Sequence, residues 1–400
     1  MTRPAKSQRL AIVVSHPTQY YSPWFRWMTA HADALHLRVF YLWNAGVNPT
    51  HDPQFGTTFA WDVDLLSGYD HEFVPNTSRT PGSDRFSGLR NPELPFRLAV
   101  WRPDAVLLFG YNYVTHLRLI LWARLCGLPL IFRGDSHLLG RGQLSWTKRL
   151  PLSLLYRQFA AFATVGEANR AYFRTFGVPA NKLFAVPHCV NADHFTPTDT
   201  TRAEADRLRT SLDLDGKRIV LFAGKLVSAK QPVELLEAFI HLAPENTALV
   251  FVGEGETRPA LKILAASRPD LAVRFLPFAN QTEIPARYLL ADLFVLPSRG
   301  HYETWGLAVN EAMHMGVPAL VSDRVGCQQD LVTDGETGWA FQADDIVSLE
   351  TKLAAALAAL AEPASRARIR AAVAARICLY TYKQATSGLL SALRGIPDLK

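Results

Sequence analysis

Two glutamates flank a glycine that directly precedes a predicted helix. Glu303 lies in the loop after a buried strand, Gly306 follows it, and a helix predicted to begin near Leu307 carries Glu311. A helix N-terminus after a glycine offers backbone N–H groups and a positive dipole end, which together bind anions. Carboxylates beside a phosphate site are better suited to accept hydrogen bonds from hydroxyls, such as those of a sugar or a ribose. The alternative is a helix-cap acid at Glu303 and a surface residue at Glu311.

Two lysines follow another strand that ends in a glycine. Gly224 closes the apolar run, and Lys225 and Lys230 come before a helix that Pro232 could open. Ammonium groups at the carboxyl edge of a parallel sheet are placed to neutralise a diphosphate, and could do so in place of a metal ion. The alternative is a pair of solvated loop lysines.

Short apolar, β-branched runs alternate with helical segments in two series, and this predicts two doubly wound parallel sheets. The first series comprises residues 10–15, 35–42, 104–110, 129–134 and 160–166, and the second comprises 218–224, 247–253, 272–278, 291–298 and 317–323. We therefore predict an α/β fold with an N-terminal domain over residues 1–195 and a C-terminal domain over 200–378.

The connecting and terminal segments complete this organisation. Residues 187–200 are rich in Pro, Thr and Asp and read as the linker, and the Ala- and Arg-rich residues 348–375 read as helix. A closing helix within 379–400 is expected to pack back on the first domain. Residues 48–95 lack periodicity and predict an elaborated loop near the cleft, with short strands around residues 61–65.

Composition restricts the class of protein. The 400 residues carry a net charge of +6, and four widely spaced cysteines form no CxxC pair, so neither a zinc site nor a disulfide framework is expected. No export signal or spanning segment is apparent, which favours the cytoplasm. The dispersed basic charge suits an anionic partner, without a nucleic-acid signature.

Beyond these features, the chain resembles the family 4 glycosyltransferases, which are retaining enzymes of the GT-B fold. The resemblance is strongest from residue 224 to 345, where the Gly-Lys strand end, VGEGETRPALK, LPFANQTEIPARYLLADLFVLPS, the paired glutamates and SDRVGCQQDLVTDGETGWAF occur in the family's order. The N-terminal half resembles the family more loosely, through AIVVSHPTQYYSPWFRW and PHCVNADHF. The resemblance to this family implies two Rossmann-like domains that face a cleft.

The resemblance also implies roles for the donor-site residues. Lys225 and Lys230, beside the strand-end Gly224, would hold the diphosphate of a UDP-sugar or GDP-mannose. Glu311 would take the ribose hydroxyls and Glu303 those of the transferred sugar. The remaining implied contacts are the backbone N–H groups of Gly306 and Leu307 toward phosphate or sugar, and a base pocket formed by Phe278, Ala279 and Asn280.

Two departures from the family concern charge and the first domain. Lys225 stands where the family often has arginine, so the charge is kept but the bidentate fork is lost. No histidine falls on the family's usual position after residues 129–134, which leaves Arg133, Asp135 and His137 as acceptor contacts or as a loop salt bridge or cap. His16 and Gln19 are predicted to contact the diphosphate or the acceptor, or else to shape a turn.

The family mechanism implies front-face attack, with no protein nucleophile, required cofactor or metal. An epimerase of the same architecture and a sugar-nucleotide-binding module without turnover are the alternatives. The acceptor stays open between a lipid-linked glycan, a polysaccharide end and a small molecule, and no oligomeric state is predicted. Peripheral contact with the inner membrane face is predicted from basic and aromatic residues, namely Arg118, Trp122, Arg124, Trp146, Lys148 and Arg149.

Overall fold

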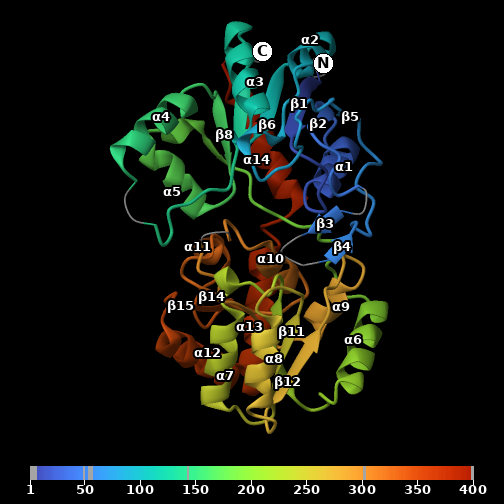
Figure 1. The fold of residues 1–400 in the computed structure, drawn as a ribbon, viewed down its shortest axis with the longest axis vertical. Coiled ribbons are helices and arrows are strands. Elements are labelled where there is room, and N and C mark those ends of the chain that lie inside the picture. Colours follow the sequence, from blue (N-terminus) through green and yellow to red (C-terminus); the bar gives the residue numbers. More distant parts are fainter. Residues whose placement is uncertain (1–6, 48–49, 53–56, 142–143, 301–302, 398–400) are drawn as a thin grey trace, which may run out of the picture.

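Two parallel β-sheets, each covered by helices on both faces, form the upper and lower halves of the molecule (Figure 1). The computed structural model describes residues 7–47, 50–52, 57–141, 144–300 and 303–397. All ten of the apolar runs named above form strands, because β-branched and aromatic side chains suit a sheet buried on both faces.

The first sheet has seven strands in the order β5-β2-β1-β6-β7-β8-β9. Its strands are β1 (Gln8–Val14), β2 (Leu35–Tyr41), β5 (His71–Phe73), β6 (Ala105–Phe109), β7 (Leu130–Arg133), β8 (Ala161–Thr164) and β9 (Leu183–Ala185). The helices are α1 (Ser22–His31), α2 (Leu94–Trp101), α3 (Val114–Leu125), α4 (Trp146–Tyr156) and α5 (Glu167–Thr175), with 3-10 turns η1 (Phe86–Gly88) and η2 (Ala180–Lys182). Helix α1 packs in the core on one face of the sheet, and α2 to α5 pack in the core on the other.

The second sheet has six strands in the order β12-β11-β10-β13-β14-β15. Its strands are β10 (Arg218–Ala223), β11 (Thr247–Val252), β12 (Ala272–Leu276), β13 (Leu293–Leu296), β14 (Ala319–Ser322) and β15 (Gly338–Phe341). The helices are α6 (Asp199–Ser211), α7 (Pro232–Leu242), α8 (Arg258–Ala266), α9 (Ile284–Leu289), α10 (Leu307–His314), α11 (Gln328–Leu331) and α12 (Ile346–Ala361), and η3 (Ser228–Lys230) is a 3-10 turn. One hydrophobic core joins both faces of this sheet.

The C-terminal segment returns to the first half of the molecule. Helix α13 (Pro363–Ile377) packs on α10 and α12, and α14 (Tyr382–Arg394) packs on β8, β9 and α1. Trp24 of α1 donates a 3.0 Å hydrogen bond to Thr386 of α14. The single helical segment expected over residues 348–375 is two helices, because Pro363 lacks the N–H needed to continue α12 and instead opens α13.

The loop region between β2 and β5 differs from the sequence prediction. Strands β3 (Thr50–Asp52) and β4 (Thr57–Phe59) pair antiparallel, whereas residues 61–65 form no strand, so the prediction of strands there was wrong. The Asp64 carboxylate accepts hydrogen bonds from the backbone N–H groups of Leu66 and Ser67, at 3.0 and 3.1 Å. Such an aspartate turn satisfies the backbone locally and competes with strand pairing.

No helix within the described residues is long and apolar enough to cross a bilayer.

Candidate functional site

The cleft between the two sheets begins at the N-terminus of α10. Gly306 precedes this helix with φ 97°, and a Cβ there would lie 2.8 Å from Val325, so the turn needs glycine. Trp305 and Asn310 lock the turn through a 2.7 Å hydrogen bond from the indole to the amide oxygen. The first backbone N–H groups of α10 therefore point at the cleft, which is lined by Gly306 and Leu307.

The lysines reach the same cleft from the end of β10. Gly224 and Gly253, at the ends of neighbouring strands, lie so close that a Cβ on Gly253 would come within 2.0 Å of the Gly224 carbonyl. Lys230, at the end of η3, brings its ammonium group to Gly224, and Lys225 lines the cleft beside it. The carboxyl edge of the sheet thus holds two cations, the kind of charge that a diphosphate requires.

The two glutamates differ in their surroundings. Glu303 forms a 2.9 Å ion pair with Lys230, and its side chain is 12% exposed. Glu311 is buried and accepts a 2.7 Å hydrogen bond from the Tyr288 hydroxyl and another hydrogen bond from Tyr20 of the first domain. Burial raises the pKa of Glu311 to about 7, although both tyrosines and Lys230 act to lower it. Neither glutamate is a surface residue.

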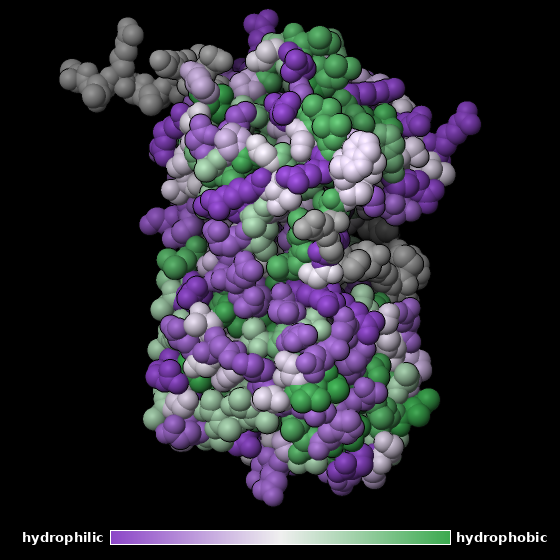
Figure 2. Space-filling view, turned by 90° about the vertical axis from the view of Figure 1, so that its left-hand side faces the viewer, coloured by the Kyte–Doolittle hydropathy of each residue, from purple (hydrophilic) through white to green (hydrophobic). Residues whose placement is uncertain are grey.

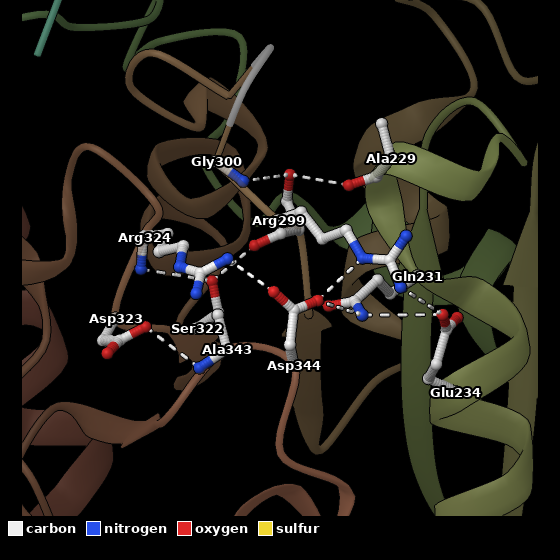
Figure 3. Close-up of polar contacts among 11 residues, drawn as sticks. Ala229, Gln231, Glu234, Arg299, Gly300, Ser322, Asp323, Arg324, Ala343 and Asp344 are labelled. Atoms are coloured by element: carbon white, nitrogen blue, oxygen red, sulfur yellow. Dashed lines mark hydrogen bonds and ion pairs between the residues drawn. The ribbon is translucent and has the colours of Figure 1, made fainter. Parts of the chain in front are cut away.

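An ionic network holds together the loops that carry Lys230 and Glu303 (Figure 3). Asp344 pairs with Arg299 at 2.7 Å and with Arg324 at 2.5 Å, and it accepts a 3.2 Å hydrogen bond from Gln231. Gln231 directly follows Lys230, and Arg299 donates its backbone N–H to the Ala229 carbonyl. Asp344 is therefore an exposed anchor that joins three loops through its side chain.

The opposite wall of the cleft belongs to the first domain and includes Gln19 and Asp135. Asp135 accepts a 2.7 Å hydrogen bond from Thr304. His188, which sequence reasoning did not single out, is buried with its Nε2 4.0 Å from Asp135. Burial, and then the charge of Arg133, hold the pKa of His188 well below its usual range, so it lines this wall as a neutral imidazole.

Residues 60–62 of the first domain contact the second domain at one end of the cleft. The Ala60 carbonyl accepts a 2.8 Å hydrogen bond from Asn280, and the Asp62 carboxylate accepts one of 3.1 Å from the backbone N–H of Thr282. Trp61, between them, lines the cleft. Because Asn280 adjoins Phe278 and Ala279 in the predicted base pocket, Trp61 stands at that end of the cleft.

The structure brings together most of the predicted site. The cleft has a volume of about 500 Å³ and is lined by eleven of the predicted residues, namely Gln19, Asp135, Gly224, Lys225, Lys230, Phe278, Ala279, Glu303, Gly306, Leu307 and Glu311. This volume suits a nucleotide sugar, since small-molecule sites measure about 300–1,000 Å³.

Four predicted residues lie outside this lining. Arg133 is buried beneath it, donates to the Val186 carbonyl at 2.8 Å and stacks 5.1 Å from the Trp24 ring, so it supports the cleft rather than facing it. His137 contacts the Glu303 carbonyl at 3.4 Å, and His16 pairs with Ser15. Asn280 bridges the domains through Ala60 instead of lining the base pocket.

Groups of three or more potential metal-ligating side chains are absent from the part of the chain that the structure describes. The lining of the cleft places both lysines and the N-terminus of α10 around the same space.

Comparison with known proteins agrees with this geometry. Residues 204–374 match the family described as glycosyl transferases group 1. D-inositol 3-phosphate glycosyltransferase of Geodermatophilus obscurus is 30% identical over 335 residues, which cover 70% of this chain and 68% of that protein. The enzyme of the same name from Xylanimonas cellulosilytica is 30% identical over 239 residues. That match spans 58% of this chain and 55% of the relative, so the chain spans about half the length of several curated relatives it matches.

Solved structures share the fold over nearly the whole chain. A glycosyltransferase from Rickettsia africae has a TM-score of 0.75 at 12% identity and covers 98% of this chain and 99% of its own. Anabaena HepE, solved in complex with UDP and glucose, has a TM-score of 0.70 at 16% identity, with 97% and 99% covered. These similarities and the two parallel sheets confirm the predicted GT-B fold.

Proposed function

Because this chain belongs to the group 1 glycosyl transferases, the family 4 enzymes of GT-B fold, we propose that it moves a sugar from a nucleotide-diphosphate donor to a hydroxyl acceptor with retention of configuration. One observation carries the proposal. Lys230, Glu303, Glu311 and the α10 N-terminus converge on a single cleft of about 500 Å³ between the domains. The donor is a UDP-sugar or GDP-mannose, and the product belongs to bacterial glycan or glycoconjugate synthesis.

The donor diphosphate binds between the lysines and the N-terminus of α10. Lys225, Lys230 and the backbone N–H groups of Gly306 and Leu307 supply positive charge and hydrogen-bond donors on the cleft wall. Glu311 accepts hydrogen bonds from the ribose hydroxyls. Its ionised form suits this role, because a carboxylate accepts several hydroxyl donors at once.

The base lies toward Phe278 and Ala279, at the end of the cleft where Trp61 stands. The transferred sugar lies toward Glu303, whose carboxylate accepts its hydroxyls. Asp135 and His188, across the cleft from the donor side, face the acceptor. We assign each residue its role from the wall of the cleft on which it lies and from the charge of its side chain.

The reaction proceeds on one face of the sugar. The bond between the anomeric carbon and the phosphate oxygen breaks, the acceptor oxygen bonds to the same face, and the acceptor proton passes to the leaving phosphate oxygen. Negative charge grows on the diphosphate, so Lys230 stabilises the transition state more than the ground state. The two lysines supply this charge without a metal ion, and no protein nucleophile takes part.

Two alternative functions would use the same cleft. A nucleotide-sugar epimerase would return a nucleotide sugar with its diphosphate bond intact, and a binding module would return the donor unchanged. The enzyme is proposed to work in the cytoplasm, at the inner membrane face when its acceptor is carried by a lipid.

The test is a panel of UDP- and GDP-sugars incubated with the purified protein and scored by release of UDP or GDP. Release from one donor, reduced strongly in Lys230→Ala but not in Lys262→Ala on α8, supports the proposal. Lys262 is exposed and lies outside the cleft, so it controls for loss of a lysine as such. Absence of release from every donor, in protein that circular dichroism shows to be folded, would contradict it.

A further inference from the structure

Three neighbouring helices of the first domain present apolar side chains to the outside. Of the twelve exposed large hydrophobic side chains among the described residues, eight lie on α2, α3 and α4. They are Phe96 and Val100 on α2, Leu117, Leu121 and Leu125 on α3, and Trp146, Leu150 and Leu154 on α4. A soluble helix normally buries such a set, so its exposure indicates an interaction surface.

The spacing forms a continuous stripe on each helix. Leu117, Leu121 and Leu125 recur every four residues, and their exposed fractions rise from 41% to 78%. The opposite side of α3, including Leu119 and Ile120, is buried in the core of the sheet. Helix α3 thus carries apolar side chains on both sides, and the three leucines on its outer side are exposed.

The three stripes lie on one face of the molecule. The buried sides of α2, α3 and α4 share one core on the same face of the first sheet. Helices α2 and α3 are in contact, and Arg124 of α3 donates a 2.8 Å hydrogen bond to Gln158 just beyond α4. Figure 2, which turns the left-hand side of Figure 1 toward the viewer, shows hydrophobic surface in the upper half, among hydrophilic residues. We call the exposed outer sides of these helices the α2–α4 face.

The charged side chains within these three helices have one sign. Helices α2, α3 and α4 contain no aspartate or glutamate, whereas Arg118, Arg124, Lys148 and Arg149 are exposed on α3 and α4. Arg97 on α2 is already paired with Glu72 and Glu93, so it is not counted. Trp122, expected at this surface, is half-buried and packs on the core instead.

We propose that the α2–α4 face docks the protein peripherally on an anionic lipid bilayer. Apolar side chains that enter the boundary between headgroups and acyl chains, with cations at the level of the headgroups, are the features that bind such a surface. A protein partner of ordinary composition would present both signs of charge, whereas an anionic bilayer presents one. The proposal concerns a surface remote from the donor residues and holds whether or not the proposed transfer reaction is correct.

Sedimentation with vesicles tests the docking. The purified full chain is expected to bind vesicles of phosphatidylcholine mixed with phosphatidylglycerol at low salt, and to bind much less at high salt or to phosphatidylcholine alone. Arg118→Gln and Lys148→Gln should each weaken partitioning roughly fivefold, the effect of one cation near a charged membrane. Leu121→Glu should weaken it by about tenfold or more, since it removes a leucine from the apolar contact.

Matched controls lie on α8 of the second domain, where Ile263 is 75% exposed beside the exposed Lys262. Ile263→Glu and Lys262→Gln should bind vesicles as the wild type does. Each variant is checked by circular dichroism and by an unchanged melting temperature. The proposal is overturned if the wild type stays in the supernatant with anionic vesicles, if the α8 variants lose binding equally, or if Leu121→Glu dissociates a dimer, which would make this face an interface between two copies.

Discussion

Replacing Glu311 by glutamine should stabilise the protein and weaken donor binding at the same time. Burial raises the pKa of this carboxyl from 4.5 to about 7. At 1.36 kcal/mol per unit, the folded state pays roughly 3 kcal/mol to hold the ionised form. Glutamine is neutral, and its amide oxygen can accept a hydrogen bond from the Tyr288 hydroxyl in place of the carboxylate, which accepts one of 2.7 Å.

The sign of this effect depends on pH. Because the folded-state pKa lies above the unfolded value, folding favours the protonated form, and the cost of Glu311 is absent below about pH 4 and complete above about pH 7. Glu311→Gln should therefore melt at nearly the wild-type temperature near pH 4. Near pH 8 the transition of the second domain should rise by about 5–10 °C.

Donor binding should change in the opposite direction. Loss of a charged acceptor costs roughly 1–3 kcal/mol, so donor KM should rise about five- to 150-fold while kcat changes little. Wild-type KM should fall as pH rises through about 7, because the ribose needs the carboxylate, and the variant should lose this dependence.

The assays are differential scanning fluorimetry and steady-state kinetics over this pH range, with Glu336→Gln as an exposed control. A variant that is no more stable near pH 8 would refute the argument from burial. An unchanged donor KM would refute the ribose assignment.

Four further predictions concern the same cleft. Lys230→Ala should lower kcat as well as raise donor KM, because Lys230 faces the diphosphate, whose negative charge grows as the bond breaks. Glu303→Gln should behave similarly. Steady-state kinetics with wild-type values for both variants would contradict this. Nucleotide release should persist in excess EDTA, and loss that Mg²⁺ restores would show that the lysines do not suffice. Trp61→Ala should raise donor KM with little change in kcat, since Trp61 lines the base end of the cleft, and an unchanged KM would remove it from the site. Asp344→Asn should lower kcat several-fold with less effect on KM, because asparagine tolerates the backbone φ of 61° but breaks both ion pairs. The control is Asp334→Asn, which alters an exposed aspartate elsewhere. Equal rates for the two variants would show that the network does not position Lys230 or Glu303.

The parts of this structure that sequence patterns predict are those fixed by local chemistry. Runs such as residues 218–224 are β-branched and bounded by glycine, so strand and turn follow from neighbouring residues. The position of Glu311 four residues after Leu307 places it on the first turns of α10, and Gly306 supplies the turn before it. The donor side of the cleft could therefore be predicted from residues of the second domain alone.

Contacts between segments distant in sequence could not be predicted in this way. His188 lines the cleft because Asp135 and Trp305, from different domains, surround it, and Trp61 reaches the cleft through bonds to residues 280–282. Arg133 is the last residue of β7, where a site residue could lie, yet its guanidinium contacts the Val186 carbonyl and aromatic rings. Asp344 stays exposed, and only folding brings Arg299 and Arg324 beside it from distant parts of the chain.

Proton NMR of the reaction mixture distinguishes retaining sugar transfer from the alternative functions of the cleft. With the nucleotide sugar that the panel identifies and a hydroxyl acceptor, we expect free UDP or GDP together with a new glycoside whose anomeric coupling matches that of the donor. A glycoside of the opposite anomer would contradict retention. A different nucleotide sugar with its diphosphate bond intact would indicate an epimerase, and an unchanged donor spectrum despite saturable binding would reduce the cleft to a binding site.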